Sequence, residues 1–121
     1  MKILTLQITG DNFEAILKGV QKIETRLCDT PKLINRYFYV NDKGENEIQK
    51  YDALRLINGR KTSGTNPELI VEIIDTNWHD YIDEKGRQMT YEFEGDEYPY
   101  IGIEFKLGKV IEHKNTEKFF K

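Results

Sequence analysis

Cysteine is almost absent from this sequence, and so is any long hydrophobic run. The single cysteine, Cys28, has no partner for an internal disulfide, which excludes a disulfide-stapled scaffold. The apolar runs span only a few residues, far fewer than the roughly 20 that a membrane-spanning helix needs. The two histidines, His79 and His113, are distant in the sequence and lack the spacing of a zinc site. We therefore expect a cytoplasmic protein with no membrane segment, no structural metal and no cofactor.

An excess of positive charge is lacking as well. The chain holds 18 Lys+Arg and 21 Asp+Glu, which gives a net charge of −3. A protein that binds long duplex DNA is usually strongly basic, so we expect no such partner. Residues 1–62 hold 11 basic and 8 acidic residues (+3), and the remainder holds 7 and 13 (−6). Within the remainder, the segment Asp80–Glu97 carries seven acids, which would suit a basic partner.

The length, composition and patterning of the sequence are those of one small α+β domain. A chain of 121 residues, 38% of them hydrophobic, is long enough to bury one core. Alternating polar and apolar residues predict strands, which are residues 3–8, 22–27, 51–57, 68–74, 88–93 and 100–107. Helical spacing predicts a helix that starts near residue 11 and ends at Gly19, and Pro31 marks a second helix start. We expect a small mixed barrel or a strongly bent sheet over residues 1–112, with a tail over 113–121.

Three segments are less clearly patterned. Residues 37–40 fit either the end of the second helix or a strand. Residues 41–49 are polar around a central glycine, which predicts a surface loop. Residues 76–83 are ambiguous. Most of the aromatic residues are expected in the core of so small a domain, and any that lie exposed beside a basic strand would stack on bases.

The predicted strand 22–27 carries Lys22, Glu24 and Arg26 on one face. The opposite face holds Ile23, Thr25 and Leu27. Two cations beside one carboxylate keep Glu24 ionised, and Glu24 in turn orients Arg26, whose guanidinium suits phosphate or carboxylate. The competing interpretation is a solvated strand face, where each ion pair is worth about 0–1 kcal/mol. The charge pattern by itself favours the solvated face.

Two weaker candidates accompany this strand. The turn at Asn58 leads into a loop with Arg60, Lys61, hydroxyl side chains and a glycine, which is typical equipment for an oxyanion site. The loop lacks P-loop spacing, so a plain hairpin loop is the competing interpretation. Cys28 lies in phase with the charged face, and cationic neighbours would lower its pKa. The alternative for a lone cysteine is an inert side chain.

Residues 16–26, which read ILKGVQKIETR, resemble the signature of ASCH domains, a helix followed by Gly-x-Lys-x-x-Glu-x-Arg. Residues 51–59 (YDALRLING), 69–72 (LIVE) and 100–111 resemble later segments of the short bacterial and phage members, in the same order. The resemblance implies a PUA-like small mixed β-barrel with one or two flanking helices. It also implies a pocket beside the signature strand that binds RNA, a nucleotide or a modified nucleoside. The resulting ligand-binding candidates are Lys22, Glu24, Arg26, Asn58, Arg60 and Lys61.

Some small ASCH proteins are amidohydrolases that remove the acetyl group from N4-acetylcytidine. The resemblance places their catalytic lysine at Gln21 and their threonine at Glu24, and their glutamate has no counterpart that we can match. This departure favours a binding domain over an enzyme. Lys22 and Glu24 remain as candidate catalytic residues of an alternative amidohydrolase, with Glu24 as the general base. A third alternative is a protein-interaction module of mobile-element origin, whose acidic segment Asp80–Glu97 would bind a basic partner.

Overall fold

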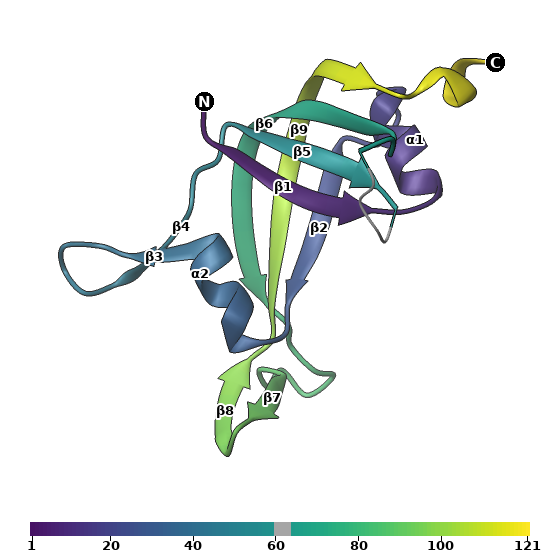
Figure 1. Ribbon diagram of the computed structural model, residues 1–121. Coiled ribbons are helices and arrows are strands. Elements are labelled where there is room, and N and C mark those ends of the chain that lie inside the picture. Colours follow the sequence, from purple (N-terminus) through teal and green to yellow (C-terminus); the bar gives the residue numbers. More distant parts are fainter. Residues whose placement is uncertain (60–63) are drawn as a thin grey trace. The chain divides into compact units, whose positions relative to one another are not determined.

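The computed structural model describes residues 1–59 and 64–121 and shows short helices among many strands (Figure 1). The helical segments are α1 (Asp11–Leu17), η1 (Pro31–Leu33), α2 (Ile34–Tyr37) and η2 (Glu117–Phe120). The strands are β1 (Ile3–Ile8), β2 (Ile23–Cys28), β3 (Phe38–Val40), β4 (Asn46–Ile48), β5 (Ala53–Asn58), β6 (Glu68–Asp80), β7 (Thr90–Phe93), β8 (Asp96–Pro99) and β9 (Ile101–Lys114). The predicted α+β class is confirmed. No helix within the described ranges has the length and hydrophobicity needed to cross a membrane.

The chain divides into two compact units. The first unit contains residues 1–24, 51–75 and 106–121, and the second contains residues 25–50 and 76–105. Strands β2, β6 and β9 each contribute residues to both units. The main sheet has the order β1-β5-β6-β9-β2, and the two small sheets are the hairpins β3-β4 and β7-β8. No pairing within residues 1–59 and 64–121 closes the main sheet.

The first unit is built around the parallel pair β1 and β5. Ile3 lies opposite Ala53 and Ile8 lies opposite Asn58, while β5 pairs with β6 in the antiparallel sense. The strict alternation along β1 buries every second side chain, as its sequence predicts. The buried apolar residues of this unit are Leu4, Leu6, Ile8, Phe13, Ile16, Leu17, Ala53, Leu54, Leu56, Ile57, Leu69, Val71 and Leu107. The amino-terminal end of β2 belongs to this unit.

Helix α1 ends at Leu17, and Gly19 lies in the turn that terminates it, as the sequence predicts. Gly19 adopts φ of +74°, a conformation that glycine enters without steric cost, and its N–H donates to the carbonyl of Ile16 at 3.0 Å. The next two N–H groups, of Val20 and Gln21, both donate to the carbonyl of Ala15, at 2.8 and 3.0 Å. These bonds fix the short connection through which the chain enters β2.

The second unit holds a hairpin where the sequence predicts a loop. Residues 46–48 form β4 and pair with β3, so the prediction of a loop over 41–49 is wrong for β4. The side chain of Asn41 accepts hydrogen bonds from the N–H groups of Lys43 and Glu45, at 2.8 and 3.0 Å. Together with Gly44 at φ of +78°, these bonds close a tight turn between β3 and β4. The three residues of β4, Asn-Glu-Ile, are too few and too polar to show the apolar alternation that marks a strand in a sequence.

A second hairpin forms from β7 and β8. Glu94 and Gly95 both have positive φ, 50° and 87°, which is the geometry of a two-residue hairpin turn. The strand predicted over 88–93 is confirmed for Thr90–Phe93, whereas Asp96–Pro99 was missed because it is short and half acidic. Within the hairpin, Thr90 donates to the carboxylate of Glu97 at 2.7 Å.

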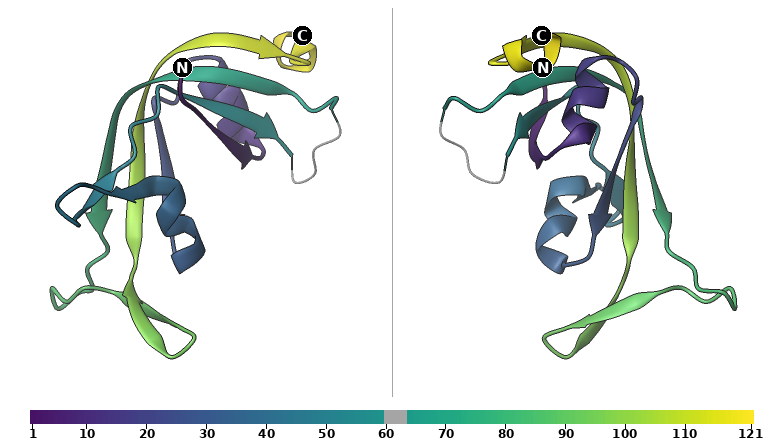
Figure 2. Two further views of the ribbon diagram at one scale, coloured as in Figure 1. Left: turned by 60° about the vertical axis from the view of Figure 1, so that its left-hand side comes forward. Right: turned by 90° about the vertical axis from the view of Figure 1, so that its right-hand side faces the viewer.

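The carboxyl-terminal segment, predicted as a tail over 113–121, includes the end of β9 and η2. Phe119 of η2 lies with its ring centroid 5.3 Å from that of Phe13 in α1, and the two elements are neighbours in both views of Figure 2. Thr116, just before η2, is 4% exposed. Part of this segment therefore packs against α1 within the first unit.

Candidate functional site

Strand β2 turns its charged side inward and its apolar side outward. Glu24 is 7% exposed and Cys28 is 1% exposed, whereas Ile23 and Leu27 are 48% and 41% exposed. Arg26, between the two buried positions, is half-buried. Glu24 therefore does not lie on a solvated face, which was the competing interpretation of this pattern.

A buried carboxylate is costly unless hydrogen bonds satisfy it. Among the described side chains, no buried polar atom lacks a hydrogen-bond partner, and Glu24 is one of the residues that have an interaction partner. The inward face of β2 thus holds a satisfied carboxylate two positions before a half-buried guanidinium. Glu24 is the last residue of its segment of the first unit, and Arg26 belongs to the second.

In the second unit, Arg26 lies near the hydroxyl of Tyr37. Burial is the main cause that raises the pKa of the Tyr37 hydroxyl, and Cys28 also raises this pKa. A hydrogen bond with Arg36 and the positive charges of Arg36 and Arg26 lower it. Tyr37 is 3% exposed and its ring centroid lies 6.4 Å from that of Phe105, so the core holds it in place. Arg36 therefore hydrogen-bonds this buried hydroxyl, and Arg26 acts on it through its charge.

This cluster has the chemistry of an anion site. Guanidinium groups present several N–H donors in a plane and match the geometry of phosphate and carboxylate oxygens. Arg36 is exposed and Arg26 is half-buried, so one cation is fixed by packing while the other reaches solvent. Sequence reasoning found Arg26 but missed Arg36 and Tyr37. Their signal was faint, because α2 is only four residues long.

Cys28 is not activated by its cationic neighbours. Burial raises the pKa of its thiol, and the charge of Asp29 raises it further. The predicted lowering of this pKa is therefore wrong, because the thiol is desolvated and its adjacent residue is an acid. Cys28 is best described as a core side chain.

Lys22 lies just before β2 and is exposed. Its backbone carbonyl accepts a hydrogen bond from the N–H of Leu107 at 2.8 Å. Its Nζ lies 3.7 Å from the position that a Cβ on Gly19 would occupy, so the side chain turns back toward the end of α1. Gln21, at the position of the catalytic lysine in the ASCH resemblance, donates from Nε2 to the carbonyl of Ile23 at 2.9 Å.

Asn58 is half-buried at the end of β5 in the first unit. Its N–H donates to the carbonyl of Pro67 at 2.9 Å, and its carbonyl accepts from the Asn66 side chain at 3.0 Å. These bonds make Asn58 the base of the loop that follows. Arg60 and Lys61, the other two candidates of that loop, lie outside the described residues.

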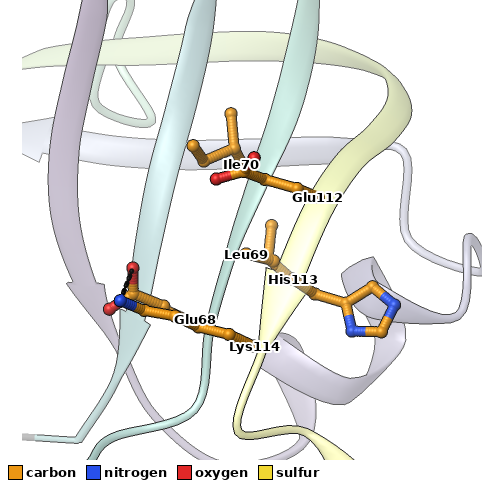
Figure 3. A pocket seen from close by; sticks show the side chains of 6 residues that line it. All are labelled: Glu68, Leu69, Ile70, Glu112, His113 and Lys114. Carbon is orange, nitrogen blue, oxygen red and sulfur yellow. Dashed lines mark ion pairs between the residues drawn. The ribbon is translucent and has the colours of Figure 1, made fainter. Parts of the chain in front are cut away.

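Two ion pairs of the first unit share Glu68 and form a separate cluster on β5, β6 and β9. Arg55 donates from Nε and Nη2 to the carboxylate of Glu68 at 3.0 and 2.9 Å, and Lys114 lies 3.5 Å from the same group. Figure 3 shows Glu68, Glu112 and Lys114 on one side of the strands and the ring of His113 on the other. The hollow that they line holds about 30 Å³, the space of one water molecule, which is too small for an organic ligand.

The acidic segment Asp80–Glu97 uses several of its carboxylates locally. Asp83 accepts from the N–H groups of Lys85 and Arg87, each at 2.9 Å, and thereby forms a turn. Asp80 accepts from the side chain of Gln88 at 2.6 Å. Across the described residues, no group of three or more His, Cys, Asp or Glu side chains is arranged to hold a metal ion.

The expectation that most aromatic residues lie in the core is wrong for the second unit. Of its ten Phe, Tyr and Trp residues, only Tyr37, Phe38 and Phe105 are buried, at 3%, 7% and 0% exposure. Trp78 is 49% exposed and Tyr39 is 43% exposed, and the others are half-buried. The second unit thus displays aromatic surface together with Arg26 and Arg36.

No protein-family model matches this chain, and neither a curated protein nor a solved structure gives a significant match. The resemblance to ASCH domains therefore rests on the sequence segments described above.

Proposed function

We propose that the chain is an ASCH-like binding domain that recognises RNA or a nucleotide-like ligand through Arg26 on β2. The PUA-like barrel that the resemblance implies belongs to the same proposal. The observation that carries it is the orientation of β2, with Glu24 at 7% exposure inside while Ile23 at 48% and Leu27 at 41% lie outside. Strands that only stabilise a fold usually have the opposite arrangement.

The physical argument concerns the cost of this arrangement. Full burial of a large apolar side chain is worth about 1.5–3 kcal/mol, and Ile23 and Leu27, at 48% and 41% exposure, each forgo part of it. Burying a carboxylate adds a desolvation cost. Sequences break such local rules mainly at functional sites. Arg26 and Arg36, both in the second unit, supply phosphate donors.

A short single-stranded RNA or a mononucleotide suits this site better than a long duplex does. The net charge of −3 provides no general attraction for a polyanion. Sequence-specific RNA recognition uses unstacked bases, and the aromatic surface of the second unit offers stacking partners for them. The ligand is thus expected to carry one or two phosphates and at least one accessible base.

The test is a binding titration with a panel of mononucleotides and short single-stranded RNA oligomers at low salt. We expect Arg26→Ala to weaken binding about 5- to 150-fold, which corresponds to about 1–3 kcal/mol for a charged hydrogen bond. Arg87→Ala removes an exposed guanidinium of the same unit and serves as the matched control. Absence of binding by the intact protein across the panel would make the proposal wrong.

The amidohydrolase alternative has less support from the site. A catalytic lysine needs a desolvated or charge-tuned position, and Lys22 is exposed beside Gly19. Incubation with N4-acetylcytidine and chromatography for cytidine tests it directly. If the wild type produces cytidine and Lys22→Ala does not, the amidohydrolase becomes the better-supported function.

A further inference from the structure

The second unit contains an aromatic hollow that the proposed anion site does not use. Its volume is about 380 Å³, within the usual range for small-molecule pockets. We call it the aromatic hollow, and its main lining residues are Ile34, Phe38, Asn46, Trp78, Tyr98 and Ile101.

The walls of the hollow are aromatic rings held by their neighbours. Phe38 is 7% exposed and meets Trp78 edge-on, with centroids 5.9 Å apart and an angle of 79°. Tyr98 stacks on Tyr91 at 5.8 Å and 21°. Trp78 is nevertheless 49% exposed, so a large part of the indole is available to a ligand. A ligand would find flat, preformed surfaces here.

The polar groups of the hollow are few. Among its described side chains, the Asn46 amide and the Tyr98 hydroxyl each offer a hydrogen-bond donor and an acceptor, the Trp78 N–H offers a donor, and no carboxylate or ammonium lines the hollow. An uncharged planar ring with a polar edge matches this set, because the ring stacks on aromatic faces while its edge pairs with an amide.

We propose that the aromatic hollow binds a nucleobase, with the ring against Trp78 and a polar edge at Asn46. This inference rests on the proposed function and names a base-binding subsite for it. The segment Ile34–Phe38 connects the two sites within one unit: Tyr37 lies near Arg26, while Ile34 and Phe38 line the hollow. A nucleotide would thus place its phosphate at Arg26 or Arg36 and its base in the hollow.

The same unit offers a matched control. A second hollow of about 300 Å³ is lined by Leu27, Tyr81, Met89 and Tyr100, and it lacks an amide side chain. Met89 is 44% exposed there, so Met89→Ala shortens an exposed apolar side chain away from the aromatic hollow. A general loss of apolar surface and a specific loss of the base site can therefore be separated.

Trp78 is the single tryptophan of the chain, so its fluorescence reports directly on the aromatic hollow. Uncharged nucleosides, 5′-monophosphates and short single-stranded RNA are titrated against the protein, with free tryptophanamide correcting for absorption. We expect saturable quenching by nucleosides that persists in Arg26→Ala. We expect Tyr98→Ala to weaken nucleoside binding about 5- to 150-fold, the range for losing one base-stacking partner.

The outcomes separate this inference from the proposed function. If oligonucleotides bind through Arg26 while Trp78 emission stays constant and Tyr98→Ala binds normally, the base site is wrong and the proposed function stands. If nucleosides saturate the hollow but Arg26→Ala leaves oligonucleotide affinity unchanged, the phosphate assignment fails instead. Equal losses in Tyr98→Ala and Met89→Ala would also overturn the base site.

Should Tyr98→Ala unfold, Asn46→Ala replaces an exposed side chain and keeps the question open to measurement. We expect this variant to retain quenching while its preference among the four nucleosides weakens. Unchanged preference together with unchanged affinity would contradict the role of Asn46. Quenching by choline or an aliphatic peptide, without quenching by nucleosides, would assign the hollow to another ligand class and overturn the inference.

Discussion

Tyr37 couples the candidate anion site to the stability of the fold. Burial raises the pKa of its hydroxyl and outweighs the lowering by Arg36 and Arg26. The folded protein therefore holds this proton more tightly than the unfolded chain does, whose pKa lies near 10. The corresponding contribution to stability is complete below about pH 10 and is lost as the pH rises further.

We predict that the free energy of unfolding falls less in Tyr37→Phe than in the wild type when the pH is raised from about 9 to 11. The reason is that phenylalanine has no proton to lose. Urea melts at several pH values measure the difference. Tyr81→Phe, a half-buried tyrosine of the same unit, is the control. Parallel pH profiles for the wild type and Tyr37→Phe would contradict the prediction.

At the scale of one element, β2 and the turn before it make contrasting predictions for two charged residues. Glu24 is 7% exposed, so Glu24→Gln removes acceptors from buried donors and should cost about 1–3 kcal/mol. Lys22 is exposed, and Lys22→Gln should stay within about 0.5 kcal/mol of the wild type. Urea melts of the three proteins at neutral pH measure both changes. Equal costs would mean that the inward orientation of β2 does not exist in solution.

The same strand shows how far the sequence reaches. Alternation along residues 22–27 predicted the strand and separated its two faces correctly, but it did not tell which face is buried. The apolar face was the natural choice for the interior, and the structure has the reverse, with Leu27 at 41% exposure. The surrounding elements decide the orientation, and a single strand carries no information on them.

Other elements also divide into those that a local sequence signal predicts and those that it does not. The strict alternation of β1 and the glycine that ends α1 are local signals, and both predictions are confirmed. β4 and β8 are three and four residues long and mostly polar, so no local signal marks them. Arg26 was found from its spacing and its match to a known signature. The sequence did not assign Tyr37 or Trp78 to the site. Only the fold brings Tyr37 under the influence of Arg26 and leaves Trp78 half-exposed.

At the scale of the whole molecule, the small number of phosphate contacts in the proposed site predicts a weak response of binding to salt. Contacts with about two phosphates, at Arg26 and Arg36, give a slope of log K against log salt near −1.4 for a single strand. We predict that Arg26→Ala flattens this slope by about 0.7. Titrations of a short RNA between about 50 and 200 mM salt measure it. A slope several times steeper would require many more phosphate contacts than the anion site provides.

The parallel pairing of β1 with β5 also affects how the chain is made. Each residue of β1 pairs with a residue 50 positions later, since Ile3 lies opposite Ala53 and Ile8 opposite Asn58. At a synthesis rate of about 5–20 residues per second, β1 waits roughly 3–10 s for its partner to be made. Leu4, Leu6 and Ile8, all buried in the finished unit, stay uncovered by β5 during that interval. During that interval the nascent chain therefore presents an unpaired hydrophobic strand, a segment that chaperones would be expected to shield until translation passes residue 58.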